Sequence, residues 1–258
     1  MRKTKKIALF FGITGFLLIL TGIAASFALP VTPLNDSASS RTLYFSTVRS
    51  LTVSTGTLPI RVELTDGDVC EVSFLSDLPV VAATDEFGTL RLTQDDDFSL
   101  TFFSRRRRDF HLTVKLPIRT YERISLSSSS GGIDCAAIDC DSLEISTRSG
   151  AIVLDGADER AKLRTESGTV DLTLSALNGE MTVTAGTGDV RLRVKDGLSY
   201  CLRFLTDGGT LYEAGSEDPP PLGDAALFRG KMTHRLDVIT AGGDLYYSEF
   251  SDDPDGLS

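Results

Sequence analysis

Residues 160–174 read RAKLRTESGTVDLTL and contain one unit of the pattern that decides the fold. An alternating segment leads into a Ser/Thr-rich corner that ends in Gly168, and a second alternating segment follows. Apolar residues occur five and seven positions before this glycine and two and four positions after it. Because side chains two residues apart in a strand point to the same side, these four residues share one face. The unit therefore predicts two strands that are joined by a glycine corner.

The same unit recurs along residues 124–247. Its glycines are separated by 19, 18, 20, 21 and 34 residues, and they are Gly131, Gly150, Gly168, Gly188, Gly209 and Gly243. The positions five before and two after each glycine are apolar in all six units. The positions seven before and four after are apolar too, except for Glu213. The intervening residues, which should point outward, include Ser146, Arg164, Thr182, Asp171 and Arg191.

One unit buries too few apolar side chains to offset the backbone entropy that its folding costs, so such units are stable only when stacked. The sequence therefore predicts an all-β fold, a single-chain β-solenoid of about 18–21 residues per coil. The alternative is an antiparallel sandwich with glycine turns. At the corners, we expect the glycines to adopt positive φ.

The preceding segment contains a looser version of this pattern, with short alternating runs at 51–53, 60–64, 69–72, 81–83 and 90–92. Gly56, Gly67 and Gly88 are the expected corners, and Gly88 fits the register with Ala83 five before it and Leu90 two after it. We expect a linker over residues 30–42, the solenoid domain over 43–248 and an acidic tail over 249–258.

The first 29 residues predict a membrane anchor. Four basic residues lie within residues 2–6, and the 23 residues from Ile7 to Leu29 carry no charge. A transmembrane helix needs about 20 apolar residues, whereas the apolar part of a signal peptide has about 7–15. The basic cluster places the amino terminus in the cytoplasm, so the remainder would be extracytoplasmic. The alternative is a signal peptide that is cleaved near Ser26-Phe27-Ala28.

The charge of the chain argues against nucleic-acid binding. The formal net charge is −10, and the residues after the anchor contain 22 basic against 36 acidic side chains. Such a surface repels phosphate backbones, and no basic stripe with interleaved aromatic residues offsets it.

The four cysteines, Cys70, Cys135, Cys140 and Cys201, permit disulfides in an extracytoplasmic protein but lack the spacing of a framework. They are expected either as reduced, buried side chains or with one bridge between Cys135 and Cys140. The sequence offers no Cys-x-x-Cys pair and only two histidines, which gives little support to a zinc site.

The outward acids do not form a catalytic ladder. Asp134 and Asp171 occupy the third position after their glycines, but Val153, Arg191, Tyr212 and Tyr246 occupy that position in the other units. Asp189 and Asp244 occupy the first position. We interpret these acids as solvated, against the alternative of a calcium or glycosidase site, and His111 and His234 as surface residues. No catalytic residue, metal or cofactor is expected.

The most conspicuous charge cluster is Arg105-Arg106-Arg107-Arg108, which lies between Phe102-Phe103 and the alternating run 110–116. It is expected at the tip of a hairpin, either as a solvated loop or as a contact for phosphate or carboxylate groups of lipid heads or wall polymers. An irregular insertion, residues 213–232, interrupts the last unit and is a second candidate for a binding surface.

Taken in order, Leu51-Thr52-Val53 with Gly56, the segment 85–92, the segment 114–117 and the repeated Ser-Gly corners resemble the bacterial adhesin-like domain of unknown function, over residues 43–248. The resemblance implies a β-solenoid at the cell envelope, often behind one membrane segment, with no established catalytic residues. We therefore expect a non-catalytic binding or scaffold module whose partners are the membrane, wall polymers, lipid head groups or another membrane protein. The alternatives are an accessory or sensor subunit of envelope-stress signalling and a polysaccharide-active enzyme.

Overall fold

The computed structural model describes residues 39–76, 79–94, 110–156, 160–215, 223–231 and 234–251. The chain divides into the units Met1–Ser37 and Ala38–Ser258, and all described residues belong to the second. Their regular structure consists of twenty β-strands, which confirms the all-β prediction. No helix within these ranges is long and apolar enough to cross a membrane, and the expected anchor lies outside them.

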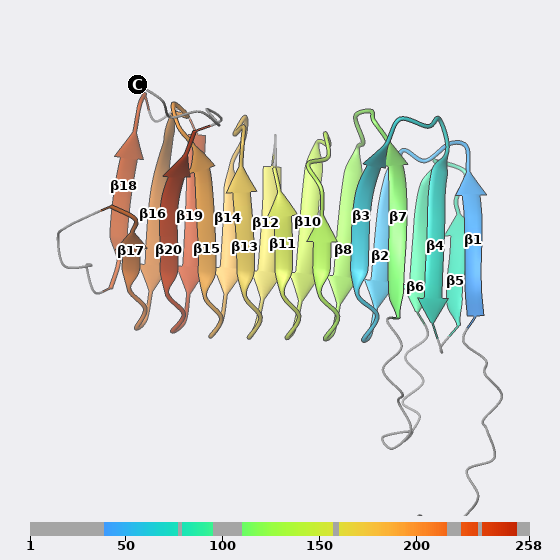
Figure 1. Cartoon of the computed structure of the whole chain (residues 1–258), viewed down its shortest axis with the longest axis horizontal. Helices are drawn as coiled ribbons and strands as arrows, with labels where there is room; N and C mark the ends of the chain where they lie inside the picture. Colours follow the sequence, from blue (N-terminus) through green and yellow to red (C-terminus); the bar gives the residue numbers. More distant parts are fainter. Residues whose placement is uncertain are drawn as a thin grey trace, which may run out of the picture. The chain divides into compact units, whose positions relative to one another are not determined.

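The strands form two ten-stranded sheets, A and B, which face each other across a shared core (Figure 1). Sheet A contains, in spatial order, β1 (Ser39–Phe45), β4 (Cys70–Ser76), β7 (His111–Pro117), β3 (Ile60–Thr65), β9 (Ile133–Cys135), β11 (Ile152–Asp155), β13 (Val170–Leu174), β15 (Val190–Lys195), β20 (Leu245–Phe250) and β17 (Leu211–Glu213). Sheet B contains β18 (Ala225–Arg229), β16 (Tyr200–Thr206), β19 (His234–Thr240), β14 (Met181–Ala185), β12 (Arg160–Thr165), β10 (Ser142–Thr147), β8 (Arg123–Ser128), β2 (Ser50–Thr55), β6 (Thr89–Gln94) and β5 (Val80–Thr84).

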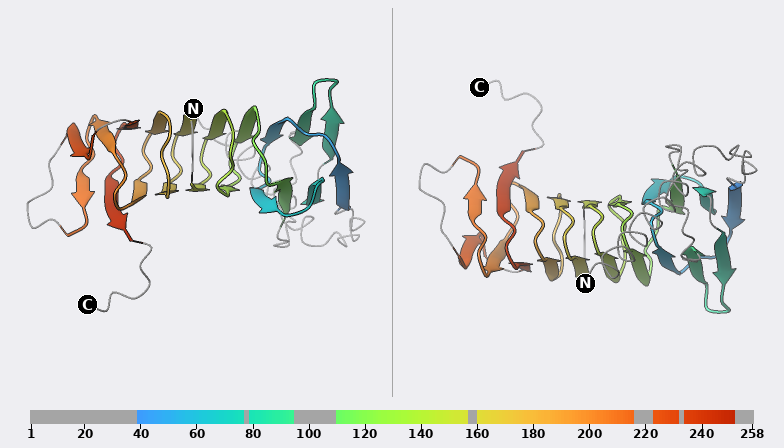
Figure 2. Two further views of the ribbon diagram at one scale, coloured as in Figure 1. Left: turned by 90° about the horizontal axis from the view of Figure 1, so that it is seen from above. Right: turned by 90° about the horizontal axis from the view of Figure 1, so that it is seen from below.

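Each coil has its first strand in sheet B and its second in sheet A, as the views in Figure 2 show. The coils β8–β9, β10–β11, β12–β13 and β14–β15 follow one another in the chain and pair in parallel. Ile145 of β10, for example, aligns with Leu126 of β8 and Leu163 of β12. These parallel coils confirm a solenoid-like fold, and the antiparallel sandwich is wrong for this part of the chain.

The inward rows that the sequence predicts form the core. Side chains five before and two after the corner glycines are each at most 3% exposed: Leu126, Ile145, Leu163, Val183, Phe204, Val238, Ile133, Ile152, Val170, Val190, Leu211 and Leu245. The residues expected to point outward are half-buried or exposed: Ser146, Arg164, Thr182, Asp171 and Arg191. The predicted register is therefore confirmed.

The prediction of positive φ at the repeat corners is wrong, because none of the six corner glycines has positive φ. These glycines are required by space instead. A Cβ atom on Gly168 would lie 1.9 Å from the carbonyl oxygen of Gly150, and one on Gly188 would lie 1.8 Å from that of Gly168. Successive coils approach so closely at this corner that no side chain fits between them.

A hydroxyl three residues before the glycine fixes most of these corners. Thr165 Oγ1 accepts a hydrogen bond from the Gly168 N–H at 2.9 Å. The same bond recurs from Gly131 to Ser128 at 2.9 Å, from Gly150 to Thr147 at 3.0 Å and from Gly209 to Thr206 at 2.7 Å. The glycine N–H groups at these corners thereby form hydrogen bonds with side chains rather than with a neighbouring strand.

At both ends of the sheets, the coils do not stack in sequence order. The last coil in the chain, β19–β20, lies between the coils β14–β15 and β16–β17. At the other end, the first coil, β2–β3, lies between β8–β9 and β6–β7. The first and last coils of the chain are therefore both internal, with a coil from the middle of the chain outside each.

Antiparallel strands flank the outermost coils. β4 and β1 continue sheet A beyond β7, β5 continues sheet B beyond β6, and β18 pairs with the outer edge of β16. An antiparallel strand at the end of a sheet prevents a further coil from pairing there in parallel. Protecting exposed sheet edges in this way is common.

These end strands correct three expectations. Gly88 lies in the hairpin turn between β5 and β6 with φ of 82°, not at a coil corner, and Ala83 is exposed. The insertion over residues 213–232 contains the regular strand β18. β1 begins at Ser39, so residues 39–42 belong to a strand although the sequence suggests a linker there.

Arg229 of β18 joins the two sheets at one end of the core. It donates hydrogen bonds to Glu213 of β17 at 2.6 Å and to Glu249 of β20 at 2.7 Å. The Tyr247 hydroxyl also donates to Glu249, and it lies 2.5 Å from the Tyr200 hydroxyl. These five residues form the Arg229 cluster, which explains why Glu213 interrupts the apolar pattern of the repeat.

We expect the Arg229 cluster to make the stability of the domain depend on pH. Hydrogen bonds from Tyr247 and Arg229 lower the pKa of Glu249 from its ordinary value of 4.5. A carboxyl group with a lowered folded-state pKa contributes stability above its ordinary pKa, and this contribution is lost as the pH falls through the lowered value. When the pH is lowered below 4.5, the melting temperature of Glu249→Gln should therefore fall less than that of the wild type.

Thermal unfolding followed by circular dichroism at neutral and acidic pH measures this difference. Glu144→Gln is the control for the removal of one carboxyl group, since Glu144 lies far from β18 on the exposed face of β10. Equal acid sensitivity of wild type and Glu249→Gln would contradict the role of the cluster.

No disulfide joins any of the four cysteines, and Cys70, Cys135 and Cys140 are buried. Burial raises the pKa of the Cys70 thiol to about 11, and it also raises the pKa of Cys135. Thiols that resist ionisation are poor nucleophiles and pack as small apolar side chains. The structure therefore supports reduced cysteines rather than a bridge between Cys135 and Cys140.

Candidate functional site on the outer face of sheet B

Strand β12 exposes three basic side chains on the outer face of sheet B. Its residues alternate between buried and exposed, and the exposed ones are Arg160, Lys162 and Arg164. Alternate residues of a strand are about 6.6 Å apart, so the three cations form a row about 13 Å long. We call these three residues the β12 basic row.

Hydroxyl groups flank this row on both sides. Ser142, Glu144 and Ser146 of β10 align with its three members, while Thr182 and Thr184 of β14 align with Lys162 and Arg164. Arg164 therefore lies between two hydroxyl-bearing residues, and Lys162 lies between a carboxylate and a hydroxyl.

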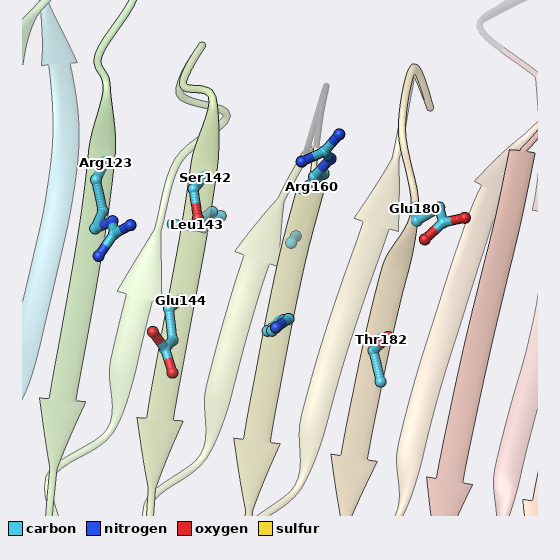
Figure 3. A pocket seen from close by; sticks show the side chains of 9 residues that line it. Arg123, Ser142, Leu143, Glu144, Arg160, Glu180 and Thr182 are labelled. Carbon is cyan, nitrogen blue, oxygen red and sulfur yellow. The ribbon is translucent and has the colours of Figure 1, made fainter.

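A shallow groove of about 320 Å³ crosses this face from β8 to β14 (Figure 3). Its lining consists of Arg123, Ser142, Leu143, Glu144, Arg160, Ala161, Lys162, Glu180 and Thr182. In Figure 3, Arg123 and Arg160 lie on either side of Ser142, with Glu144 beneath them and Glu180 on the far side of Arg160. The groove lining and the adjacent Arg164 together carry four basic groups against two acidic ones.

The row is not held by ion pairs. Several basic residues elsewhere are paired, such as Arg61 with Asp134 at 3.2 Å, Lys115 with Glu71 at 3.2 Å and Arg191 with Asp171 at 3.3 Å. Within the described ranges, no ion pair involves Arg123 or any member of the β12 basic row. Like charges this close repel one another, so the row is not explained by the stability of the fold.

The chemistry of this face suits an extended anion. Guanidinium and ammonium groups bind phosphate and carboxylate oxygens, and the flanking hydroxyls can donate to the same ligand. The groove is open rather than enclosed, which differs from the deep pockets of most small-molecule sites. Among the residues that the structure describes, no group of three His, Cys, Asp or Glu side chains could hold a metal ion.

The four arginines predicted as an anion contact, Arg105–Arg108, lie outside the described residues, and their role stays a prediction. The strand before their segment, β6, ends at Gln94, whose Nε2 donates to Ser76 Oγ at 3.4 Å. Ser76 aligns with Ser39, where β1 begins. Gln94, the last described residue before these arginines, therefore lies near the start of β1.

The other sequence-based candidates have local structural partners. Asp134 and Asp171 form the ion pairs given above. Asp189 accepts a hydrogen bond from the Asp244 N–H at 3.1 Å, and Asp244 accepts one from the Thr210 N–H at 2.9 Å. His111 begins β7 and His234 begins β19, so neither lies in the groove.

The sequence alone did not single out the β12 basic row. The repeat correctly places Arg164 as an outward residue, but that position alone does not link it to Arg160 and Lys162. The available signal was the alternation of basic and apolar residues over 160–164, combined with the serines and threonines that align with it in neighbouring units.

The fold and this open polar face define an all-β, solenoid-like domain. The family model described as Toastrack DUF4097 matches residues 48–194, which is more than half of the chain. The chain therefore belongs to the Toastrack family.

The fold is similar to that of a solved structure. A proposed cell adhesion protein from Clostridium sporogenes is 13% identical, with coverage of 82% of this chain and 100% of that chain and a TM-score of 0.52. A proposed adhesin from Bacteroides fragilis is also 13% identical, with coverage of 81% and 97% and a TM-score of 0.40. At such identities the likeness concerns the fold alone. Among curated proteins, the search found no match.

Proposed function

We propose that this protein is a membrane-anchored, extracytoplasmic module that binds phosphate or carboxylate groups of the cell envelope and catalyses no reaction. The observation that carries this proposal is the β12 basic row, which presents three cations without ion-pair partners among the described residues. The row lies on a domain that is otherwise acidic, so it localises the attraction for an anion to one face.

The anchoring part of the proposal rests on the sequence. The uncharged span of 23 residues ends at Leu29, and β1 begins at Ser39. A tether this short keeps the domain close to the membrane, so weak contacts with the membrane surface become effective. Arg105–Arg108 would add a second contact, because the last described residue before them, Gln94, lies near the start of β1.

The core that the described residues form lies within unit Ala38–Ser258, so this segment is suited to binding experiments without the anchor. We propose cosedimentation of residues 38–258 with three targets: phosphatidylglycerol vesicles, phosphatidylcholine vesicles and purified cell wall. Measurements at low and high salt then separate electrostatic from other binding.

The variant with Arg160, Lys162 and Arg164 all changed to Ser should bind phosphatidylglycerol vesicles or cell wall about 100-fold more weakly, because each basic residue near an anionic surface contributes about 1 kcal/mol. The matched control changes Arg61, Lys115 and Arg193 to Ser. These residues lie on sheet A, so the control alters the net charge equally but leaves the β12 basic row intact.

Binding to vesicles alone would identify lipid head groups as the ligand, and binding to cell wall alone would identify a wall polymer. Equal weakening of both triple variants, or no binding of the wild type to any target at low salt, would refute the proposal. In the same assay, changing Arg105–Arg108 to Ser tests the second contact separately.

A further inference from the structure

Two tyrosines form a stacked pair on the outer face of sheet A. The rings of Tyr212 and Tyr246 lie 5.1 Å apart at an angle of 10°, and each residue is 41% exposed. They align across β17 and β20, and β17 is the last strand of sheet A in the described part of the chain. The pair therefore ends the outward row of its sheet.

Carboxylates and a guanidinium surround this pair. Asp189 and Asp244 each accept one backbone hydrogen bond and keep further acceptor sites for a ligand. Asp244 precedes Tyr246 by two residues, and Asp189 is joined to Asp244 by the hydrogen bond between their neighbouring strands. Desolvation, and then the charges of these two carboxylates, raise the pKa of Tyr246. Arg191 aligns with Tyr246 on the next strand and pairs with Asp171 at 3.3 Å.

We propose that this surface, the tyrosine platform formed by Tyr212, Tyr246, Asp189 and Asp244, binds an uncharged sugar unit of a glycan. The apolar C–H face of a pyranose can stack on the face of the Tyr212 ring that points away from Tyr246, while hydroxyls of the bound glycan donate to the carboxylates and accept from Arg191. The two aspartates repel phosphate and carboxylate groups, so the ligand of the platform differs from the anion proposed for sheet B.

The platform lies on the sheet opposite to the β12 basic row, and its ligand goes beyond the proposed function. The two sites would let one coil stack hold a charged and an uncharged envelope component at the same time. Each site can be removed without touching the other, because their residues belong to different strands of different sheets.

The chain contains no tryptophan and six tyrosines, so tyrosine fluorescence reports ligand binding directly. We propose titrating residues 38–258 with tetrasaccharides of N-acetylglucosamine, glucose and mannose, with calorimetry as the second readout. We expect at least one of them to bind, and Tyr212→Ala and Tyr246→Ala to weaken that binding by about tenfold or more.

Two controls separate binding from folding. Tyr44→Ala removes a tyrosine that is 65% exposed on β1, at the other end of sheet A, and should bind as the wild type does. Tyr246→Phe keeps the ring and should retain most of the affinity, which a variant that merely unfolds would not do.

No binding of any of the three tetrasaccharides at about 10 mM, far above a millimolar Kd, would overturn the inference. So would unchanged affinity in both alanine variants, because the tyrosines would then serve only as a cross-strand pair. Binding of phosphatidylglycerol vesicles by the same alanine variants reports on sheet B alone, so the two proposals fail or succeed independently.

Discussion

Replacing Leu172 with alanine is expected to lower the free energy of unfolding by about 2–5 kcal/mol, the usual cost of truncating a buried leucine. Leu172 lies on β13 and is 1% exposed. Its row aligns with Leu154 on β11 and Leu192 on β15, both of which are also buried. The lost methyl groups would leave a cavity that three stacked coils cannot easily close.

Ser146→Ala is the control for this substitution. Ser146 lies on the outer face of β10 and is half-buried, so its change should stay within about 0.5 kcal/mol. Urea unfolding of residues 38–258, followed by circular dichroism, gives both values. Equal destabilisation by the two variants would contradict the register in which Leu172 faces the core.

Gly243→Ala is expected to be a second strongly destabilising substitution. A Cβ atom at this corner would lie 2.0 Å from the carbonyl oxygen of Gly188, so the β19–β20 coil would have to move away from its neighbour. Forcing extra atoms into a packed interior typically costs about 1–3 kcal/mol, and the cost is higher when the clash is with backbone.

The adjacent Gly242 provides a matched control, because a Cβ atom there meets nothing within 4 Å. Gly242→Ala should change the free energy of unfolding by no more than about 1 kcal/mol, and its sign could be favourable because alanine restricts the unfolded chain. The same urea titration measures both variants. If Gly243→Ala were as stable as Gly242→Ala, the steric explanation of the corner glycines would be wrong.

The parallel coils and their core could be predicted because the signals are local. The alternation around each glycine fixes which side chains face inward, and the repeat distance fixes which residues align, as Ile145 does with Leu126 and Leu163. Register in a half-buried strand is strongly specified, since a shift by one residue would expose the whole apolar set.

The order of the coils could not be predicted in this way. The pattern of β19–β20 fits any position in the stack, and nothing near Gly243 indicates that the coil lies inside β16–β17 rather than outside it. The steric need for glycine at the corners could not be predicted for a related reason. The close approach of Gly150 to Gly168 joins residues 18 positions apart, and local φ preferences do not reveal it.

The candidate sites also differ in whether local sequence or only the fold reveals them. Arg105–Arg108 are conspicuous because they are consecutive, whereas the β12 basic row is interrupted by core residues and becomes visible only when strands are aligned. The repeat places both Tyr212 and Tyr246 at the third position after their glycines. Their contact follows from the placement of β17 beside β20, which no local pattern encodes.

The most direct test of the anion-binding face is the acetylation of single lysines, with and without the ligand. Residues 38–258 contain only Lys115, Lys162, Lys195 and Lys231, and Lys162 is the member of the β12 basic row. Both Lys162 and Lys231 are exposed, so both should react readily in the free domain. With phosphatidylglycerol vesicles or cell wall present, whichever binds, we expect mass spectrometry to show slower acetylation of Lys162 and an unchanged rate at Lys231. An unchanged rate at Lys162 under conditions where the domain is bound would show that the ligand contacts another surface.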